Sequence, residues 1–350
     1  MLDFNKPAVT PHPYLLSDLR LVPPGPGRLR HGLAGKSQLR FLHRVLQVGT
    51  EVATAMLLDR LRPLQGGVQM VEVGHAPTQG DSLALYMHWS PAGGVSDMVL
   101  GQLAAWRACG FDVVFVTNAA PSPLDWEKAG QNTVLRVARD NVGRDFGAWR
   151  DALAIVLQHR PSPRELLLAN DSVLGPIRPL AAVMAALRAG GDGMFGLTEN
   201  RGGGSHLQSY TLLARGDAAV KDVALHLAAC QPSRSKWQLV QKGEIGLTRH
   251  MLARGHRVAA LFGYDRITGA LRPDDLRPLG PRFAEPDAVD RYPLNPTHHL
   301  WRVLIERFGF PFLKTELVQR NPERLPGVDA WPALVNGPTR RLLDEHLGAI

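Results

Sequence analysis

The chain has 350 residues, of which 45% are hydrophobic and 21% are charged, and its formal net charge is +8. This length and balance are typical of a globular protein with a substantial buried core. No basic run is interleaved with aromatic residues, which argues against a nucleic-acid partner. The two cysteines, Cys109 and Cys230, lie far apart in apolar helical contexts. This placement argues against a disulfide framework and favours a reducing cytosol.

The first 80 residues differ in character from the rest. Residues 1–35 are rich in Pro and Gly and predict a loosely ordered arm. Residues 37–63 predict a helix in which arginines stand among apolar residues. One interpretation is a helix packed on the main domain. The other is a basic amphipathic helix resting on an anionic inner-membrane surface, a peripheral contact. The chain has no apolar run of the roughly 18 residues of a membrane span, and its start lacks a signal-peptide core, so a cytoplasmic location is expected.

From residue 80 onward, short apolar runs alternate with helical patterns. This rhythm predicts an α/β fold whose mainly parallel sheet is flanked by helices and joined by right-handed crossovers. We expect a domain over residues 81–325, preceded by the extension of residues 1–80 and followed by a tail at 326–350. The predicted strands are 83–88, 113–117, 134–138, 166–169, 194–197, 209–214 and 258–262. The predicted helices are 98–109, 146–158, 179–188, 217–229, 244–252 and 298–308, with a long loop at 265–296.

Two polar segments follow apolar strands directly. One runs from Asp140 to Asp145, and the other is Asn170-Asp171-Ser172. Polar residues at the carboxyl ends of neighbouring strands are where open α/β sheets bind ligands. The sequence therefore indicates an enzyme that handles a charged, phosphate-bearing substrate.

The second segment predicts a metal site. A divalent cation held by one or two carboxylates can neutralise the diphosphate of a sugar nucleotide. Asp171 would hold Mg²⁺ or Mn²⁺, flanked by the neutral oxygens of Asn170 and Ser172. The alternative is that Asp171 caps a helix starting near Gly175-Pro176.

The first segment offers groups for a nucleotide. Arg144 could meet a phosphate bidentately. Asp140 or Asp145 could accept hydrogen bonds from a base or ribose, and Gly143 would let the backbone approach closely. The alternative is a turn with a helix N-cap at Asp145 and a surface ion pair.

Three further candidates lie in the second half. Glu244, predicted at a helix start, could be the general base that deprotonates an acceptor hydroxyl, with a pKa raised by burial. The alternative is an acid placed favourably against a helix dipole. His206, Gln208 and Tyr210 follow a run of glycines and could form a lid or an acceptor-binding surface. Lys314 would neutralise phosphate charge, or simply be exposed on a strand.

Taken in order, these segments resemble the rhamnan synthesis protein F family of bacterial cell-surface polysaccharide glycosyltransferases. The resemblance runs from about Leu83 to Pro322. Its segments are the strand ending in His88, Asn141 to Asp145, Asn170 to Pro176, Gly196 to Thr198, His206 to Tyr210, Glu244 to Leu247, Asn295-Pro296 with Leu300-Trp301, and Lys314 to Pro322.

The resemblance implies a GT-A-like fold that transfers a deoxysugar, such as L-rhamnose, from a dTDP-sugar to a glycan or a lipid-linked glycan. Catalysis would rest on Glu244 and Asp171. The implied acceptor-binding residues are His206, Gln208 and Tyr210. The implied donor-binding residues are His88, Asn118, Asn141, Gly143, Arg144, Asp145, Asn170, Ser172 and Lys314. Two rival interpretations are another nucleotide-dependent transferase and a non-catalytic scaffold of a polysaccharide assembly. The absence of a glycine fingerprint after the first strand counts against a dinucleotide enzyme.

Overall fold

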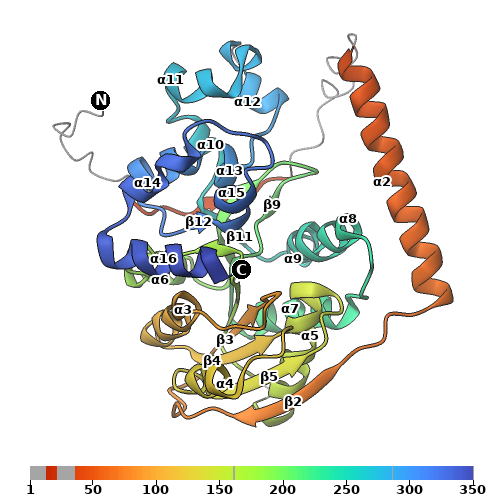
Figure 1. The fold of residues 1–350 in the computed structure, drawn as a ribbon, viewed down its shortest axis with the longest axis vertical. Helices are drawn as coiled ribbons and strands as arrows, with labels where there is room; N and C mark the ends of the chain where they lie inside the picture. Colours follow the sequence, from red (N-terminus) through yellow and green to blue (C-terminus); the bar gives the residue numbers. More distant parts are fainter. Residues whose placement is uncertain (1–12, 22–35, 161, 286, 350) are drawn as a thin grey trace.

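The computed structural model describes residues 13–21, 36–160, 162–285 and 287–349. Within these residues, ten strands form one sheet in the order β1-β11-β8-β10-β6-β3-β4-β5-β2, with β9 paired to β8. The strands β3 (Ser82–His88), β4 (Asp112–Thr117), β5 (Leu135–Arg139) and β6 (Glu165–Asn170) are parallel neighbours. The predicted α/β fold with a mainly parallel sheet is therefore confirmed (Figure 1).

The other half of the sheet mixes directions. β10 (Thr211–Arg215) runs antiparallel to both of its neighbours, β6 and β8 (Gly193–Asn200). β11 (Val258–Phe262) is parallel to β8. The remaining strands are β1 (Ser17–Asp18), β2 (Val68–Val73) and β9 (His206–Leu207), and a separate two-stranded sheet joins β7 (Val173–Leu174) to β12 (Leu313–Lys314).

Alternation along the strands divides the core into two layers. Tyr86 and Leu167 point into one apolar cluster, whereas Leu85 and Leu168 point into the other. This follows from the two-residue period of a strand. Because both faces are covered by helices, the middle residues of β3, β4 and β6 are apolar on both sides of the sheet. The helices on the first face include α3 (Asp97–Ala108), α6 (Ala181–Arg188), α14 (Trp301–Phe308) and α16 (Gly337–Ala349). Those on the second are α5 (Arg144–His159), α7 (Asp217–Ala229) and α9 (Gly246–Ala253).

Several predicted boundaries were wrong. Residues 265–296 are not one long loop. They begin within the helix α10 (Tyr264–Thr268) and contain the short helices α11 (Pro273–Leu276) and α12 (Ala288–Arg291). The predicted helix 298–308 is divided at Leu300 into α13 (Pro296–His299) and α14. Elements that the sequence patterns did not predict are α4 (Pro123–Gly130), α15 (Thr315–Arg320), the edge strand β2 and α16.

The C-terminal helix α16 is part of the packed structure. Its Leu343 is fully buried, and the imidazole Nδ1 of His346 lies 2.7 Å from the hydroxyl of Ser96. Ser96 also caps α3, where its hydroxyl accepts a bond from the backbone N–H of Val99. The tail without a clear sequence pattern thus covers one end of α3.

The helix α2 (Lys36–Leu61) stands beside the rest of the molecule (Figure 1). It meets the body near α8 (Lys236–Leu239), where Ser235 donates to Glu51 and Arg234 pairs with Asp59. The predicted helix is confirmed, and within the described residues it contacts the domain at α8. No helix among the described residues is both long enough and apolar enough to cross a membrane. Most of the predicted arm, residues 1–12 and 22–35, lies outside the described residues.

Candidate functional site

The site is built where the order of the sheet reverses. From β3 the chain passes outward to β4 and β5, then returns to place β6 on the other side of β3. Such a switch point leaves a crevice at the carboxyl ends of the two central strands. Here the backbone N–H of Trp89, after β3, donates to Oδ2 of Asp171, after β6, at 2.8 Å. Asp171 thus spans the crevice.

The two polar segments meet at this point. The side-chain amide of Asn170 donates to Oδ2 of Asp145 at 2.8 Å. Asn170 also accepts a hydrogen bond from the hydroxyl of Ser172 at 2.5 Å. The expectation that the segment ending at Asp145 and the segment around Asp171 converge is therefore confirmed.

Neither acid caps a helix, as the structural alternatives for these residues required. The next helix after Asp171 is α6, which begins only at Ala181, so Asp171 caps no helix. The N-cap of α5 is Gly143, and Asp145 lies in its first turn. Gly143 has a φ of 78° and Arg144 a φ of 51°, a left-handed conformation that costs a non-glycine residue free energy. The turn aims Asp145 at Asn170 while leaving Arg144 exposed.

Lys314 enters the same cluster from far along the chain. Pairing of β12 with β7 places it beside Ser172, whose hydroxyl oxygen lies 2.8 Å from Nζ. Nζ also lies 5.3 Å from the centre of the Tyr210 ring. Burial lowers the pKa of Lys314, while the carboxylates of Glu244 and Asp145 act to raise it. The ammonium group of Lys314 therefore interacts electrostatically with both Glu244 and Asp145.

Glu244 lies opposite this lysine, on an irregular turn. It belongs to a π-helical segment, η1 (Val240–Ile245), between α8 and α9, and so it is not at a helix start as predicted. Its Oε1 lies 3.1 Å from Nε2 of His206, and its Oε2 accepts a bond from the Ser209 hydroxyl at 2.5 Å. π-helical turns occur often at functional sites.

The expected rise in the pKa of Glu244 was wrong. Burial does act to raise this pKa, but the hydrogen bonds from His206 and Ser209, with the charge of Lys314, lower it below its ordinary value. Each of these partners stabilises the charged form of the carboxylate. Glu244 is therefore ionised at neutral pH.

The other two carboxyl groups behave in the opposite way. Burial raises the pKa of Asp171 to about 7, since the Trp89 N–H bond offsets it only in part and Asp145 adds repulsion. Burial also raises the pKa of Asp145, with Lys314 opposing the rise and Glu244 adding to it. The three acids share a small volume with a single lysine. A bound cation would relieve the repulsion between Asp145 and Asp171.

Four predicted ligand-binding residues do not face the crevice. His88 is 1% exposed, and burial lowers its pKa to about 4, so it is a neutral core histidine bonded to Thr117. Gln208 and Tyr210 are both buried and both bond to Thr198. His206, 2% exposed, supports Glu244 from behind. A direct contact of these four side chains with a ligand is not supported by this geometry.

Asn118 and Asn141 join the end of β4 to the loop that precedes α5. Asn118 donates to Oδ1 of Asn141 at 3.1 Å and accepts from the buried guanidinium of Arg139 at 2.9 Å. Arg139 also donates to the carbonyl of Val142 and pairs with Asp151. Asn118 thus holds the loop in place, while Asn141 remains exposed to solvent.

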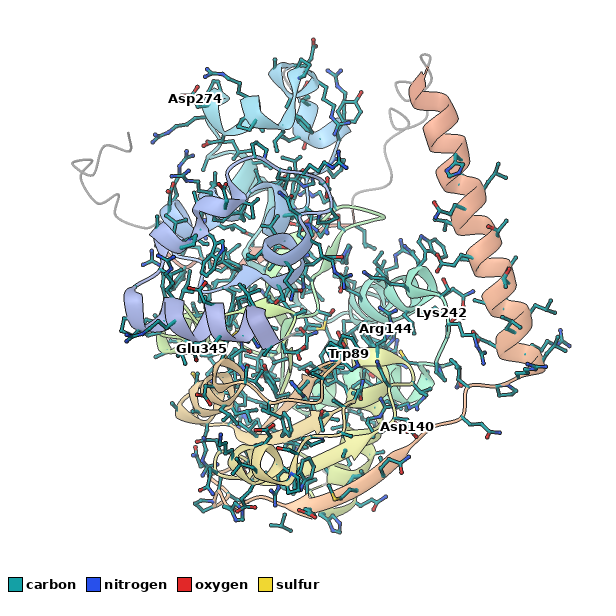
Figure 2. All side chains as sticks on the ribbon, viewed as in Figure 1. Trp89, Asp140, Arg144, Lys242, Asp274 and Glu345 are labelled. Atoms are coloured by element: carbon teal, nitrogen blue, oxygen red, sulfur yellow. The ribbon has the colours of Figure 1, made fainter. Side chains whose placement is uncertain are left out.

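Trp89 is a residue that the sequence patterns did not single out. Its side chain is 45% exposed although its backbone is tied to Asp171. Figure 2 shows Trp89 and Arg144 toward the middle of the molecule, where the strand ends meet the helices above them. The only sequence signal was a tryptophan directly after a buried strand. An exposed aromatic face beside charged groups is suited to stacking on a base or a sugar.

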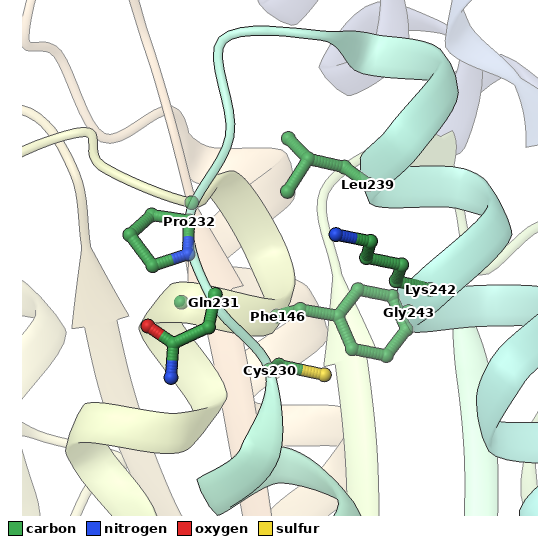
Figure 3. A pocket seen from close by; sticks show the side chains of 9 residues that line it. Phe146, Cys230, Gln231, Pro232, Leu239, Lys242 and Gly243 are labelled. Carbon is green, nitrogen blue, oxygen red and sulfur yellow. The ribbon is translucent and has the colours of Figure 1, made fainter. Parts of the chain in front are cut away.

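A narrow cleft lies beside η1. Its walls are Gly143, Phe146, Gly147, Cys230, Gln231, Pro232, Leu239, Lys242 and Gly243. Figure 3 shows the Phe146 ring beneath Gly243, where a Cβ atom would come within 2.7 Å of the ring. The glycine therefore lets η1 pack closely on the start of α5. This contact fixes the segment carrying Glu244 against the segment carrying Asp145.

Within the described residues, no group of three or more His, Cys, Asp or Glu side chains could hold a metal ion unaided. Asp171 and Asp145 with ligand oxygens are the groups that would fit a hard cation here, because Mg²⁺ often keeps only one or two carboxylates and completes its shell with phosphate and water.

The crevice, sheet order and helices together fit the GT-A-like class of α/β folds. Residues 113–274 match the family model described as Rhamnan synthesis protein F, which confirms the resemblance expected from the sequence for this part of the chain. The match includes Asp145, Asp171 and Glu244, but Trp89 and Lys314 lie outside it.

Two curated proteins are similar in sequence to this chain. "Uncharacterized protein y4gN" of Sinorhizobium fredii is 26% identical over 214 residues, which cover 59% of this chain and 55% of that protein. "Virulence protein VirA" of Vibrio anguillarum is 25% identical over 244 residues, which cover 60% of this chain and 73% of that protein. The chain thus spans about half the length of the rhizobial relative. No solved structure matches the chain significantly.

Proposed function

We propose that this chain is a glycosyltransferase of polysaccharide synthesis. It would transfer a deoxysugar, such as L-rhamnose, from a nucleoside-diphosphate donor to a hydroxyl group of a glycan or lipid-linked glycan. The observation that carries the proposal is the convergence of Asp145, Asp171, Glu244 and Lys314 at the switch point of the sheet. Open α/β sheets bind nucleotides there.

Carboxylates repel a diphosphate, so the donor would bind beside them only together with a cation. Asp171 would hold Mg²⁺ or Mn²⁺, which when bound would stabilise the negative charge of the departing diphosphate. Lys314, 2.8 Å from Ser172, would place a second positive charge beside the same oxygens. Arg144, exposed at the start of α5, would contact a phosphate from the solvent side.

Glu244 is the proposed general base. The acceptor hydroxyl would give its proton to Glu244, and its oxygen would form the new bond to the anomeric carbon. The bond from that carbon to the diphosphate oxygen would break, and the nucleoside diphosphate would leave with the electron pair. This direct displacement inverts the anomeric configuration. Glu244 is already ionised, because His206 and Ser209 lower its pKa, so it can accept the proton at neutral pH.

His206 would orient the base. Its Nδ1 lies 2.7 Å from the carbonyl oxygen of Gly204, which can only accept, so Nδ1 carries a hydrogen. Its Nε2 faces the Glu244 carboxylate at 3.1 Å. The Glu244 carboxylate is therefore held between this ring nitrogen and the Ser209 hydroxyl. When Glu244 gains the acceptor's proton, the imidazole and the Ser209 hydroxyl keep the carboxyl group in place.

Ligand-dependent thermal unfolding of the full chain tests donor binding. We expect stabilisation by dTDP-L-rhamnose or dTDP in the presence of Mn²⁺, of about 2.7 kcal/mol when free ligand exceeds Kd a hundredfold. The stabilisation should disappear with EDTA and in Asp171→Asn. It should persist in Asp274→Asn, which changes an exposed aspartate far from the crevice (Figure 2).

Transfer is tested separately by mass spectrometry of simple acceptors, such as p-nitrophenyl glycosides, incubated with the same donors. The proposal requires a product that carries one added deoxysugar. A chain that no nucleotide stabilises would be a non-catalytic scaffold. Stabilisation by NAD or another nucleotide cofactor, without any response to dTDP or UDP sugars, would make it a different transferase.

A further inference from the structure

Exposed apolar side chains are concentrated on α2. Of the seventeen large hydrophobic residues recorded as exposed in the described chain, six lie between Val45 and Leu61. Leu46 and Leu61 are each 67% exposed, and Met56 is 60% exposed. Single exposed leucines are ordinary, but a cluster of this kind on one helix marks an interaction surface.

Leu46, Leu57 and Leu61 lie on the side of α2 turned away from the domain, and the other three lie toward its flanks. The face toward the domain is marked by Val48, Val52, Ala55 and Asp59, the residues of this stretch that are not exposed. Their spacing of four, three and four residues follows one side of a helix. At 100° per residue, Leu46 and Leu57 project roughly opposite to that side. The outer, apolar face of α2 therefore has no covering within the described structure.

The charges of α2 indicate what could cover this face. Residues 36–62 contain five cations, Lys36, Arg40, Arg44, Arg60 and Arg62, and only two acids. Both acids are engaged by the body, since Glu51 accepts from Ser235 and Asp59 pairs with Arg234. The remaining formal charge is positive. Pairing two copies of this helix would bring like charges together, whereas an anionic surface would be complementary to them.

We infer that α2 docks this protein on an anionic lipid surface, with its outer apolar face lying in the interfacial plane. The helix has 26 residues, a length of about 39 Å, and is not apolar enough to cross a bilayer. A helix with leucines on one face and cations beside them lies in the headgroup region.

This inference does not depend on the proposed transfer reaction. The segment α8, against which α2 packs, leads directly into η1 and Glu244. Docking through α2 would therefore bring the catalytic segment near a lipid-linked acceptor, but vesicle binding can be measured without any sugar.

The test is co-sedimentation of the full chain with vesicles. One set contains phosphatidylcholine alone, and the other contains phosphatidylcholine mixed with phosphatidylglycerol. We expect binding to the anionic vesicles, weaker binding to the neutral ones, and release at high salt. The double substitution Leu46→Gln with Leu57→Gln should lower the affinity at least about tenfold, because two leucine side chains lose their apolar contact.

The matched control is Leu124→Gln with Leu225→Gln, which makes the same change at two exposed leucines that lie on α4 and α7, outside α2. It should bind vesicles as the wild type does. The inference is overturned if the wild type fails to bind anionic vesicles, or if the leucine double variant binds them equally well. It is also overturned if sedimentation shows a dimer that the leucine substitutions dissociate and vesicles do not bind, since a second copy then covers the face.

Discussion

The carboxyl groups at the two ends of strand β6 have pKa values shifted in opposite directions. At the amino end, Glu165 accepts bonds from the Ser82 hydroxyl, from Arg188 and from Arg215, each at 2.8–2.9 Å. Burial acts to raise its pKa, but these partners hold the pKa below its ordinary value. Six residues later, Asp171 has a pKa raised to about 7.

A second carboxylate at the amino edge of the sheet, on β4, fits the same contrast. At the amino end of β4, Asp112 is fully buried and pairs with Arg160 at 2.5 Å. At the carboxyl edge, the charged groups that act on Asp171 are another acid, Asp145, and the shared Lys314. A buried carboxylate provided with its own arginines already has its charge compensated within the fold, and removing a partner would leave that charge unpaired. One whose pKa is raised instead is left to be neutralised by a proton or by a cation that arrives with a ligand.

From this comparison we expect substitution of Asp171 to have the largest effect on sugar transfer. Asp171→Asn removes the charge but keeps an oxygen that can accept the Trp89 N–H. We expect kcat for sugar transfer to fall on the order of a thousandfold, because metal-assisted stabilisation of a leaving group is worth several kcal/mol. Circular dichroism should show an unchanged fold. Near-normal turnover in Asp171→Asn, with Asp274→Asn as the control, would falsify the assignment of Asp171.

The second prediction concerns the base. Glu244→Gln should lower kcat about a hundredfold or more, the usual contribution of a general base, while the donor Kd stays within about twofold. The amide can still accept the Ser209 hydroxyl, so η1 should keep its place. Glu345→Gln, an exposed change on α16, is the matched control (Figure 2). Equal losses of donor binding and turnover would mean that Glu244 supports the fold of the crevice rather than proton transfer.

The sequence predicted the strands well because their apolar runs are fully buried. Each run of 113–117 and 166–169 lies inside its observed strand. What the pattern could not show is the neighbour of each strand. β10 inserts antiparallel between β6 and β8, a pairing that depends on contacts across the sheet and leaves no local signal. The exposed strand β2 lacks the buried pattern altogether, so it was missed.

The site was predicted in part for the same reason. Asp145 and Asp171 were found because they directly follow predicted strands. The position of Lys314 beside Ser172 depends on a contact across 142 residues. The lowered pKa of Glu244 depends on His206 and Ser209, which a linear pattern cannot place around a carboxylate. Trp89 was passed over because exposure, rather than residue type, is what marks it.

The third prediction concerns the uncharged residue Trp89, whose backbone N–H connects the end of β3 to Asp171 after β6. Trp89→Ala should raise the donor Kd roughly twentyfold, as loss of an aromatic stacking surface costs 1–3 kcal/mol per base. Trp89→Phe should recover most of this affinity, because the backbone N–H to Asp171 is unaffected by either change. kcat at saturating donor should change little. An alanine variant with an unaltered donor Kd would show that the indole lies outside the ligand site.

The last prediction separates the two ends of β6 by the pH dependence of unfolding, with free-energy changes of about 1 to 2 kcal/mol each. For Asp171 the folded pKa is raised, so its contribution to stability is present below pH 3.8 and lost as pH rises through about 7. Asp171→Asn should therefore gain stability over the wild type as the pH increases. For Glu165 the folded pKa is lowered, so its contribution is present above pH 4.5 and lost as pH falls.

Glu165→Gln should accordingly be less stable than the wild type at neutral pH, and the difference should shrink in acid. Urea unfolding of the three proteins across this range measures both slopes, and turnover per folded molecule of Glu165→Gln should match the wild type. The two positions serve as controls for each other, because Glu165 begins β6 and Asp171 directly follows it. If the two differences in unfolding free energy changed with pH in the same direction, Asp171 would be stabilised by a partner of its own, as Glu165 is. The carboxyl edge of the sheet would then not be a ligand site.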